Sequence, residues 1–292
     1  MKAREHLGGG TAPAAELRFR SLEDVLWHEL WSEPPAALTL PTRLGPTRAY
    51  RWPGAGDPVV LLHGTGGTAL TWSPYVGRLG RPVVAVDSIG DVGRSHQQAP
   101  VRDVADLAGW LADVVDGLGL DRPDLAGTSY GGFLALALAA HHPDRVRSLG
   151  LVDPAGIAPL RLARFLLWGG AVMASSWLPG PLRRRAARRL RMPLLDDRRP
   201  LRMAFYAQRH HRARLLPPVL TDGELQAVAA PALVLAAERS EVFRPAELRA
   251  RAAALLPDAR VATVAGAGHA VVLSHVDEVV DALAAFLGDV RS

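Results

Sequence analysis

The sequence Leu125-Ala126-Gly127-Thr128-Ser129-Tyr130-Gly131-Gly132 determines what the rest of the chain is expected to form. It follows a short segment of strand type, residues 122–126, and leads into helix-forming residues 133–140. A strand, a tight turn and a helix in this order are the setting of a Gly-x-Ser-x-Gly nucleophile elbow. Glycines on both sides let the chain pack closely around a strained central residue. We therefore predict that Ser129 stands at the tip of the turn and acts as a nucleophile.

A nucleophilic serine needs a general base and an oxyanion hole, and two further segments are suited to supply them. The apolar residues 58–62 are typical of a buried strand and end in His63-Gly64-Thr65-Gly66-Gly67, a turn that can present a backbone N–H. Residues 259–264 are expected to form the last strand. They are followed by Ala265-Gly266-Ala267-Gly268-His269-Ala270 and then by a helical pattern over residues 275–287. His269 is therefore the candidate base.

In this order the motifs resemble those of the α/β-hydrolase family over roughly residues 47–287. The resemblance implies Ser129 as nucleophile and His269 as general base. It also implies an oxyanion hole made by the backbone N–H groups of Thr65 and Tyr130. The fold class that it implies is α/β, with a mostly parallel eight-stranded sheet flanked by helices and with an inserted helical cap.

The acidic member of the triad departs from the family's commonest pattern. After the strand around residues 233–235, the usual order places an aspartate where this chain has Ser240, and a serine cannot stabilise an imidazolium as a carboxylate does. Some relatives place the acid after the sixth strand, which here ends in Asp153. We favour Asp153, with Glu241 and Glu238 as alternatives. A purely structural role of Asp153, capping the turn that begins at Pro154, is also open.

Strands alternate with helices along most of the chain, which predicts a parallel sheet covered on both faces. Ligands of such sheets bind beyond the carboxyl ends of the strands, where all of these motifs lie. The expected domains are residues 1–37, an N-terminal tail and helix; residues 38–156 and 227–292, the core; and residues 157–226, the cap. Within them we expect a tail over 1–16 and an amphipathic helix over 17–31, which either covers the core or the cap or binds a partner. We also expect edge strands over 38–44 and 47–52, a structural loop over 86–95, and a helix over 101–118.

The expected cap is rich in arginine and carries several bulky apolar residues, among them Phe165, Trp168 and Trp177. The apolar side chains either line a substrate pocket or form the cap's own core. The arginines form either a solvated helix face or a surface that steers an anionic or carrier-bound substrate towards the site.

The composition is that of a globular protein, with 49% hydrophobic and 22% charged residues among 292. Cysteine is absent, so disulfides and thiolate metal sites are excluded. The first residues lack the apolar core of a signal peptide and no segment is long and apolar enough to span a bilayer, so we expect a cytoplasmic protein. A bacterial source is a separate expectation. The net charge of +5 comes almost wholly from arginine, with Lys2 as the only lysine; this pattern fits a GC-rich coding bias and does not indicate nucleic-acid binding.

The expected function is hydrolysis of a carboxylic ester or thioester of a small-molecule acyl substrate through an acyl-enzyme. A serine at the elbow argues against dehalogenase and epoxide hydrolase chemistry, for which the family uses an aspartate nucleophile. No dinucleotide or zinc motif is present, so neither a cofactor nor a metal is expected. The alternatives are a non-hydrolytic biosynthetic enzyme that uses the same triad and an inactive ligand-binding member. The oligomeric state is left open.

Overall fold

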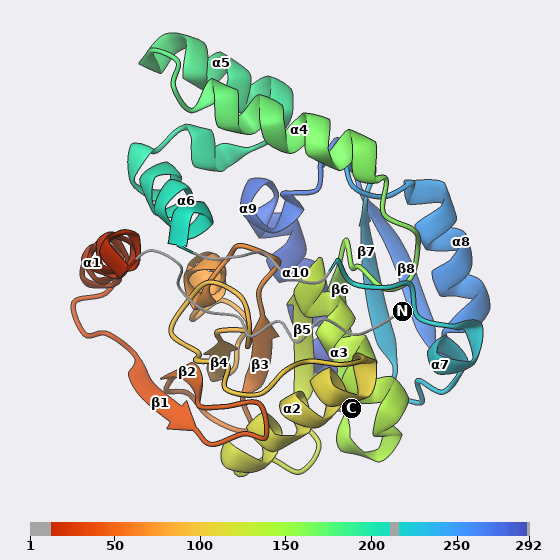
Figure 1. Cartoon of the computed structure of the whole chain (residues 1–292). Helices are drawn as coiled ribbons and strands as arrows, with labels where there is room; N and C mark the ends of the chain where they lie inside the picture. Colours follow the sequence, from red (N-terminus) through yellow and green to blue (C-terminus); the bar gives the residue numbers. More distant parts are fainter. Residues whose placement is uncertain (1–12, 211–215, 291–292) are drawn as a thin grey trace.

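The computed structural model describes residues 13–210 and 216–290, and its central element is an eight-stranded sheet (Figure 1). The strands lie in the order β1-β2-β4-β3-β5-β6-β7-β8, in which β2 pairs antiparallel with β1 and β4 and all other pairs are parallel. This confirms the predicted mostly parallel sheet. Its strands are β1 (Ala36–Leu40), β2 (Thr47–Trp52), β3 (Val59–Leu62), β4 (Val83–Val86), β5 (Asp124–Thr128), β6 (Ser148–Val152), β7 (Ala232–Ala237) and β8 (Ala259–Val264).

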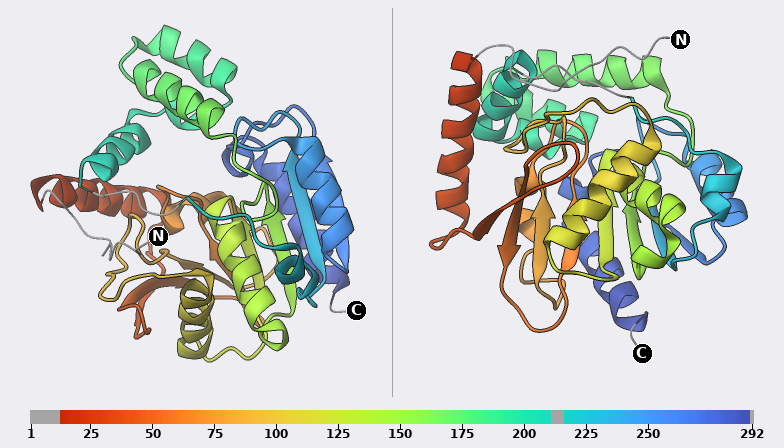
Figure 2. Two further views of the ribbon diagram at one scale, coloured as in Figure 1. Left: turned by 45° about the vertical axis from the view of Figure 1, so that its right-hand side comes forward. Right: turned by 60° about the horizontal axis from the view of Figure 1, so that its bottom comes forward.

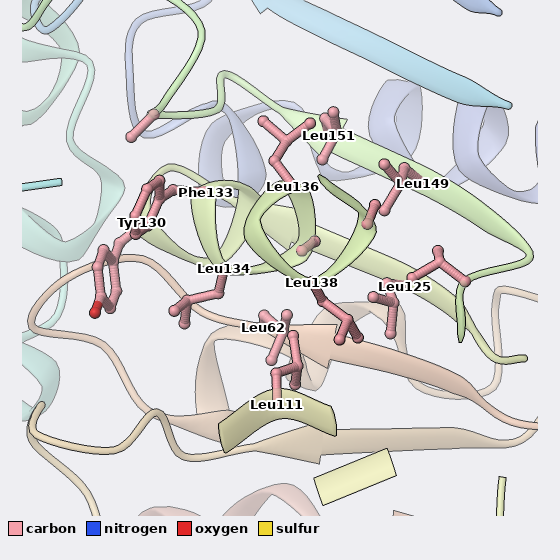
Figure 3. Packing of buried hydrophobic residues seen from close by; sticks show 14 of the residues in the cluster. Leu62, Leu111, Leu125, Tyr130, Phe133, Leu134, Leu136, Leu138, Leu149 and Leu151 are labelled. Atoms are coloured by element: carbon pink, nitrogen blue, oxygen red, sulfur yellow. The ribbon is translucent and has the colours of Figure 1, made fainter. Parts of the chain in front are cut away.

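The central strands are buried along their whole length, because helices cover both faces of the sheet. On one face α2 (Val104–Gly117), α3 (Tyr130–His141) and α8 (Pro245–Leu255) contribute to a single apolar cluster. Figure 3 shows Leu136 and Leu138 of α3 within this cluster, together with Leu125 of β5 and Leu149 of β6. The other face packs against η1 (Ala69–Tyr75), α9 (Val271–Ser274) and α10 (Val276–Asp289).

Helix α1 (Pro13–Leu30) lies along the edge of the sheet and against helix α6 (Arg198–His210) (Figure 2). Its Trp27 is buried and stacks on Tyr50 of β2, with the ring centroids 4.5 Å apart. The helix thus covers both the core and the inserted segment, as one of the two interpretations of its pattern expected. It begins earlier than predicted: residues 13–16 are helical, and Glu16 pairs with Arg20 one turn later. The rest of the expected tail, residues 1–12, lies outside the described residues.

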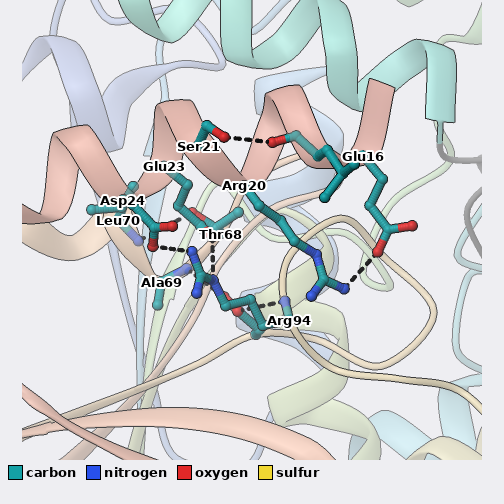
Figure 4. A network of polar contacts seen from close by, with 11 residues as sticks. Glu16, Arg20, Ser21, Glu23, Asp24, Thr68, Ala69, Leu70 and Arg94 are labelled. Atoms are coloured by element: carbon teal, nitrogen blue, oxygen red, sulfur yellow. Dashed lines mark hydrogen bonds and ion pairs between the residues drawn. The ribbon is translucent and has the colours of Figure 1, made fainter. Parts of the chain in front are cut away.

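A polar network joins α1 to the loop after β4 (Figure 4). Arg94 donates from Nε to Glu23 Oε2 at 2.7 Å and also bonds with Asp24. The buried Asp87 accepts the backbone N–H groups of Ala69 and Arg94, each at 2.9 Å. Burial, with the Asp87 charge nearby, raises the pKa of Glu23 to about 7. These bonds give residues 87–94 a structural role.

Two predicted boundaries need correction. The first edge strand ends at Leu40 and not at residue 44, because Pro41 lacks an N–H and a turn follows in which Thr42 Oγ1 donates to the Gly45 carbonyl at 2.6 Å. The helix expected over 101–118 begins at Val104, because the Asp103 side chain caps its first turn.

Between β6 and β7 the alternation of strands and helices stops. Figure 1 shows α4, α5 and α6 standing apart from the sheet. The elements of this inserted segment are α4 (Leu162–Ser175), α5 (Gly180–Leu190), η3 (Pro193–Leu195), α6 and α7 (Asp222–Gln226).

Candidate active site

Ser129 occupies the turn between β5 and α3 with a backbone conformation rare for a residue with a side chain, φ 50° and ψ −114°. Three hydrogen bonds hold it there. Its N–H donates to the Val152 carbonyl at 3.1 Å, and its own carbonyl accepts from Phe133 at 3.1 Å and from Ala155 at 3.0 Å. The strain at Ser129 is therefore imposed by the ends of β6 and α3.

The two glycines of the motif are required by contact distances. A Cβ atom at Gly127 would lie 2.4 Å from the carbonyl carbon of Gly131, and one at Gly131 would lie 2.0 Å from the carbonyl oxygen of Leu62. Any side chain at either position would collide with backbone. The turn therefore requires glycine at both positions, as the Gly-x-Ser-x-Gly pattern predicted.

His269 follows β8 and brings its imidazole between Ser129 and Asp153. Its Nε2 lies 3.0 Å from Ser129 Oγ, and its Nδ1 lies 2.7 Å from Asp153 Oδ2. The His269 side chain is 13% exposed and that of Asp153 is fully buried. With Nδ1 protonated towards the carboxylate, Nε2 is left as the acceptor that faces the serine.

Asp153, at the carboxyl end of β6, also adopts a positive φ of 42° and is held by the neighbouring strand β7. Its N–H donates to the Leu235 carbonyl at 2.7 Å. Its Oδ1 accepts the Ala237 N–H at 3.2 Å, and its Oδ2 accepts the Ser240 hydroxyl at 2.7 Å as well as His269. The carboxylate therefore points to His269 and the end of β7, and not to the turn after Pro154.

Ser240, at the position where the resemblance leads one to expect the acid, donates its hydroxyl proton to Asp153 instead. Its Oγ accepts the N–H groups of Val242 at 3.3 Å and Phe243 at 3.2 Å. A hydroxyl that accepts two N–H groups has its single proton left to give to Asp153. In the sequence, Ser240 stood out only because it occupies the position at which an aspartate was expected. Its contact with Asp153 could have been predicted, because both residues follow parallel strands that end at the same edge of the sheet.

The two alternative acids bond elsewhere. Glu241 is buried; its Oε2 accepts the backbone N–H of His269 at 2.9 Å and its Oε1 accepts from Arg191 at 2.9 Å. Glu238 accepts the N–H of Gly266 at 2.7 Å. Both carboxylates thus hold the backbone of the His269 loop.

The segments expected to supply the oxyanion hole flank Ser129. Tyr130 is the first residue of α3, and a Cβ atom at Gly64 would lie 3.3 Å from Ser129 Cβ, which places the turn with Thr65 beside Ser129. The buried His63 fixes this turn: its Nε2 accepts the Ser88 N–H at 3.0 Å, so Nδ1 carries the proton and donates to the Gly64 carbonyl at 2.9 Å. The roles of the Thr65 and Tyr130 amides stay predictions.

The inserted segment contacts the His269 loop directly. The Trp168 ring of α4 lies edge-on to the His269 ring, with centroids 6.4 Å apart, and its Nε1 donates to the Leu190 carbonyl at 2.9 Å. Arg191, at the end of α5, packs so closely that a Cβ atom at Gly268 would lie 3.0 Å from its own Cβ. Trp168 was among the bulky residues noted in the sequence; the contact made by Arg191 was not predicted.

Metal-binding groups and membrane-spanning helices can be assessed for the part of the chain that the structure describes. Within it, no group of three or more His, Asp or Glu side chains is placed to hold a metal ion. No helix there has both the length and the apolar character needed to cross a membrane.

A model of the alpha/beta hydrolase family matches residues 59–282, so the chain belongs to this family. Carboxylesterase YbfK from Bacillus subtilis is 28% identical over 279 residues, which cover 88% of this chain and 90% of that protein. The uncharacterized carboxylesterase nap from the same organism is 27% identical over 256 residues, 82% of each chain. The crystal structure of the B. subtilis carboxylesterase CesB (YbfK) superposes with a TM-score of 0.78 at 26% identity, over 94% of this chain and 98% of that one. These relatives support ester hydrolysis.

Proposed function

We propose that the protein is a serine hydrolase that cleaves a carboxylic ester or thioester through the triad Ser129, His269 and Asp153. The observation that carries the proposal is the continuous path from Ser129 Oγ to His269 Nε2 at 3.0 Å and from His269 Nδ1 to Asp153 Oδ2 at 2.7 Å. The similarity to carboxylesterases over most of the chain supports the same reaction class.

In the proposed mechanism, His269 takes the Ser129 proton as Oγ attacks the acyl carbonyl. The negative charge that develops on the carbonyl oxygen is stabilised by the N–H groups of Thr65 and Tyr130, aided by the positive end of the α3 dipole. Protonated His269 then gives its proton to the leaving group. A water molecule, activated by His269, hydrolyses the acyl-enzyme, and Asp153 stabilises the imidazolium in both halves.

Asp153 is proposed as the acid because its carboxylate bonds to the imidazole ring, whereas Glu241 bonds to the backbone N–H of the same residue. Holding Nδ1 protonated is the task of the acid in such a triad. Ser240 and Ala237 donate hydrogen bonds to the Asp153 carboxylate and so hold it in place beside His269.

The inserted segment is proposed to act as a cap over the substrate. Its Trp168 forms an apolar wall next to the base, and an apolar wall beside a reacting carbonyl suits the acyl or alcohol part of an ester. The expected substrate is a small-molecule ester, and a cytoplasmic location stays a prediction.

Hydrolysis of p-nitrophenyl esters from acetate to decanoate tests the proposal. We expect turnover by the wild type and a loss of at least about 10,000-fold in Ser129→Ala. Ser274→Ala is a matched control, because the hydroxyl of this half-buried serine bonds to the neighbouring His275 ring at 2.8 Å and to no member of the proposed triad. Labelling by a fluorophosphonate, which reports an activated serine without requiring a good substrate, should be lost in Ser129→Ala alone. A wild type that neither hydrolyses esters nor reacts with the probe would contradict the proposal.

A further inference from the structure

Helix α4 turns a row of large apolar side chains away from the protein. Leu162, Leu166 and Leu167 are 44%, 60% and 75% exposed, and Trp177 and Leu182 just beyond the helix are 75% and 53% exposed. Exposed apolar side chains are common singly, but a contiguous row of them marks an interaction surface.

Leu162 and Leu166 of this row lie on one face of the helix, and Trp177 beyond the helix lies edge-on to Phe205 of α6, with ring centroids 6.1 Å apart. Leu162, Leu166 and Gly170 follow one another at intervals of four residues, and the space beside Gly170 is open to at least 4 Å. The opposite side of α4 carries Trp168, which faces His269. Figures 1 and 2 show α4 and α5 at the periphery of the molecule, well away from the sheet. One helix therefore has its inner side at the candidate site and leaves its outer side exposed in the part of the chain that the structure describes.

Positive charge surrounds this apolar row. Residues 159–195 contain eight arginines and no aspartate or glutamate. Exposed arginines of α5 run beside the row and form no ion pair with any carboxylate in the described ranges: Arg184, Arg185, Arg188 and Arg189. At the start of α4, a groove of about 510 Å³ is lined by Arg161, Arg164 and Arg244 together with Glu247.

The charge is also unevenly distributed over the whole chain. The inserted segment, residues 157–226, holds 14 of the 34 basic residues but only four of the 29 acidic ones, so the remainder of the protein is net acidic. A charge separation of this kind turns the α4–α5 side of the molecule towards a negatively charged surface.

We propose that the α4–α5 hairpin docks on an anionic phospholipid surface. Leucine and tryptophan on one side with arginines around them are the composition of helices that lie in a membrane interface. The apolar side chains would enter the boundary of the acyl chains while the arginines bind the phosphate headgroups. The inference goes beyond ester hydrolysis, since it concerns where the protein binds and not the reaction that it catalyses.

An acidic protein partner would explain the arginines but not the extent of the aliphatic row. Five large apolar residues, each at least 44% exposed, favour insertion into hydrocarbon over docking on a polar protein surface. The lipid is therefore the partner to which the proposal commits.

Vesicle flotation tests the proposal with the full chain. Vesicles of phosphatidylcholine alone are compared with vesicles that contain about 30% phosphatidylglycerol, at about 0.05 M and about 0.5 M salt. We expect the protein to float with the anionic vesicles at low salt and to stay in solution in the other three conditions. The same measurement with Ser129→Ala should give the same result, which keeps docking separate from catalysis.

Two pairs of substitutions locate the surface. Arg185→Gln with Arg189→Gln should weaken partitioning onto anionic vesicles by roughly 10- to 30-fold, because each arginine near such a surface contributes about 1 kcal/mol of binding free energy. Leu166→Asp with Leu167→Asp should weaken it at least as much, because the row would then carry charge into the interface. The matched controls are Arg18→Gln with Arg122→Gln, and Leu17→Asp with Leu30→Asp on exposed positions of α1 and the core.

Three results would overturn the proposal. The first is a wild type that does not float with anionic vesicles at low salt. The second is floating that the control pairs reduce as much as the hairpin pairs. The third is retention of the wild type by an acidic polypeptide column that is unaffected by the leucine pair, which would assign the hairpin to an acidic protein.

Discussion

Replacing Asp153 by asparagine changes one atom of the proposed triad and leaves its shape almost unaltered. Ala237 donates its backbone N–H to Oδ1, whereas Ser240 and His269 both contact Oδ2. The fixed N–H of Ala237 will therefore orient the asparagine with its oxygen at the Oδ1 site, and its NH₂ group at the Oδ2 site. The amide NH₂ then faces His269 Nδ1, which must accept instead of donate. Nε2 therefore carries the proton and cannot take one from Ser129.

The magnitude follows from the loss of the correct tautomer. A wrong tautomer in an otherwise intact triad costs about 10⁴-fold in kcat, equal to about 5.5 kcal/mol of transition-state stabilisation. Glu241→Gln is the matched comparison, because it also replaces a buried carboxylate by an amide in the same loop region. Its amide oxygen can still accept the His269 N–H, so the change removes the charge and the hydrogen bond opposite Arg191, and we expect less than about a tenfold effect.

The assay is steady-state hydrolysis of the best p-nitrophenyl ester, with active-site titration by a fluorophosphonate to count competent enzyme. Thermal unfolding of each variant shows that the fold is retained. If Glu241→Gln lost more activity than Asp153→Asn, the acid would be Glu241, and the inference from the 2.7 Å contact would be wrong.

Three further predictions concern positions around this site. Ser240→Ala removes a hydrogen bond to the Asp153 carboxylate and should lower kcat/KM by roughly tenfold in ester hydrolysis, whereas Ser240→Thr should retain most of the activity. Gly131→Ala places a Cβ 2.0 Å from a backbone oxygen of β3 and should reduce the free energy of unfolding by about 3 kcal/mol or more in urea titrations; Gly169→Ala, with open space around it, should cost nothing. The pKa of Glu23 is raised from 4.5 to about 7 in the folded protein. Between pH 4.5 and pH 7 the folded protein therefore keeps the Glu23 proton, whereas the unfolded chain loses it. The stability that protonated Glu23 provides is present below about pH 4.5 and is lost as the pH rises to 7. The free energy of unfolding of the wild type relative to Glu23→Gln should fall by up to about 3 kcal/mol across that window, and a constant difference would contradict the shift.

The sequence was sufficient for the sheet and for the elbow because both depend on local patterns. The continuous apolar strands and the two glycines around Ser129 leave little choice of conformation, and the family match agrees with them. Strand and helix ends were less predictable, as the early start of α1 and the early end of β1 show, because individual side-chain contacts and one proline determine where these elements begin and end.

The surroundings of Asp153 could not be predicted because they depend on distant segments meeting. Ser240 is 87 residues away from Asp153 in the chain, and Arg191 is 50 residues away from Glu241. A pattern of residue types does not state which strand end lies beside which. The exposure of the apolar row on α4 was equally hidden, since a helix that packs its leucines inward has the same composition.

The pairing of β6 with β7 has a consequence for how such a site can change over time. Val152 lies opposite Leu235 in this parallel pair, so the residues that follow the two strands meet around one imidazole nitrogen. Asp153 and Ser240 already touch, one as a carboxylate and the other as a hydroxyl. During evolution a protein of this fold could therefore carry a carboxylate at both the Asp153 and the Ser240 position and then lose either one. The carboxylate would move from the end of one strand to the end of its neighbour, while His269 and Ser129 stay in place.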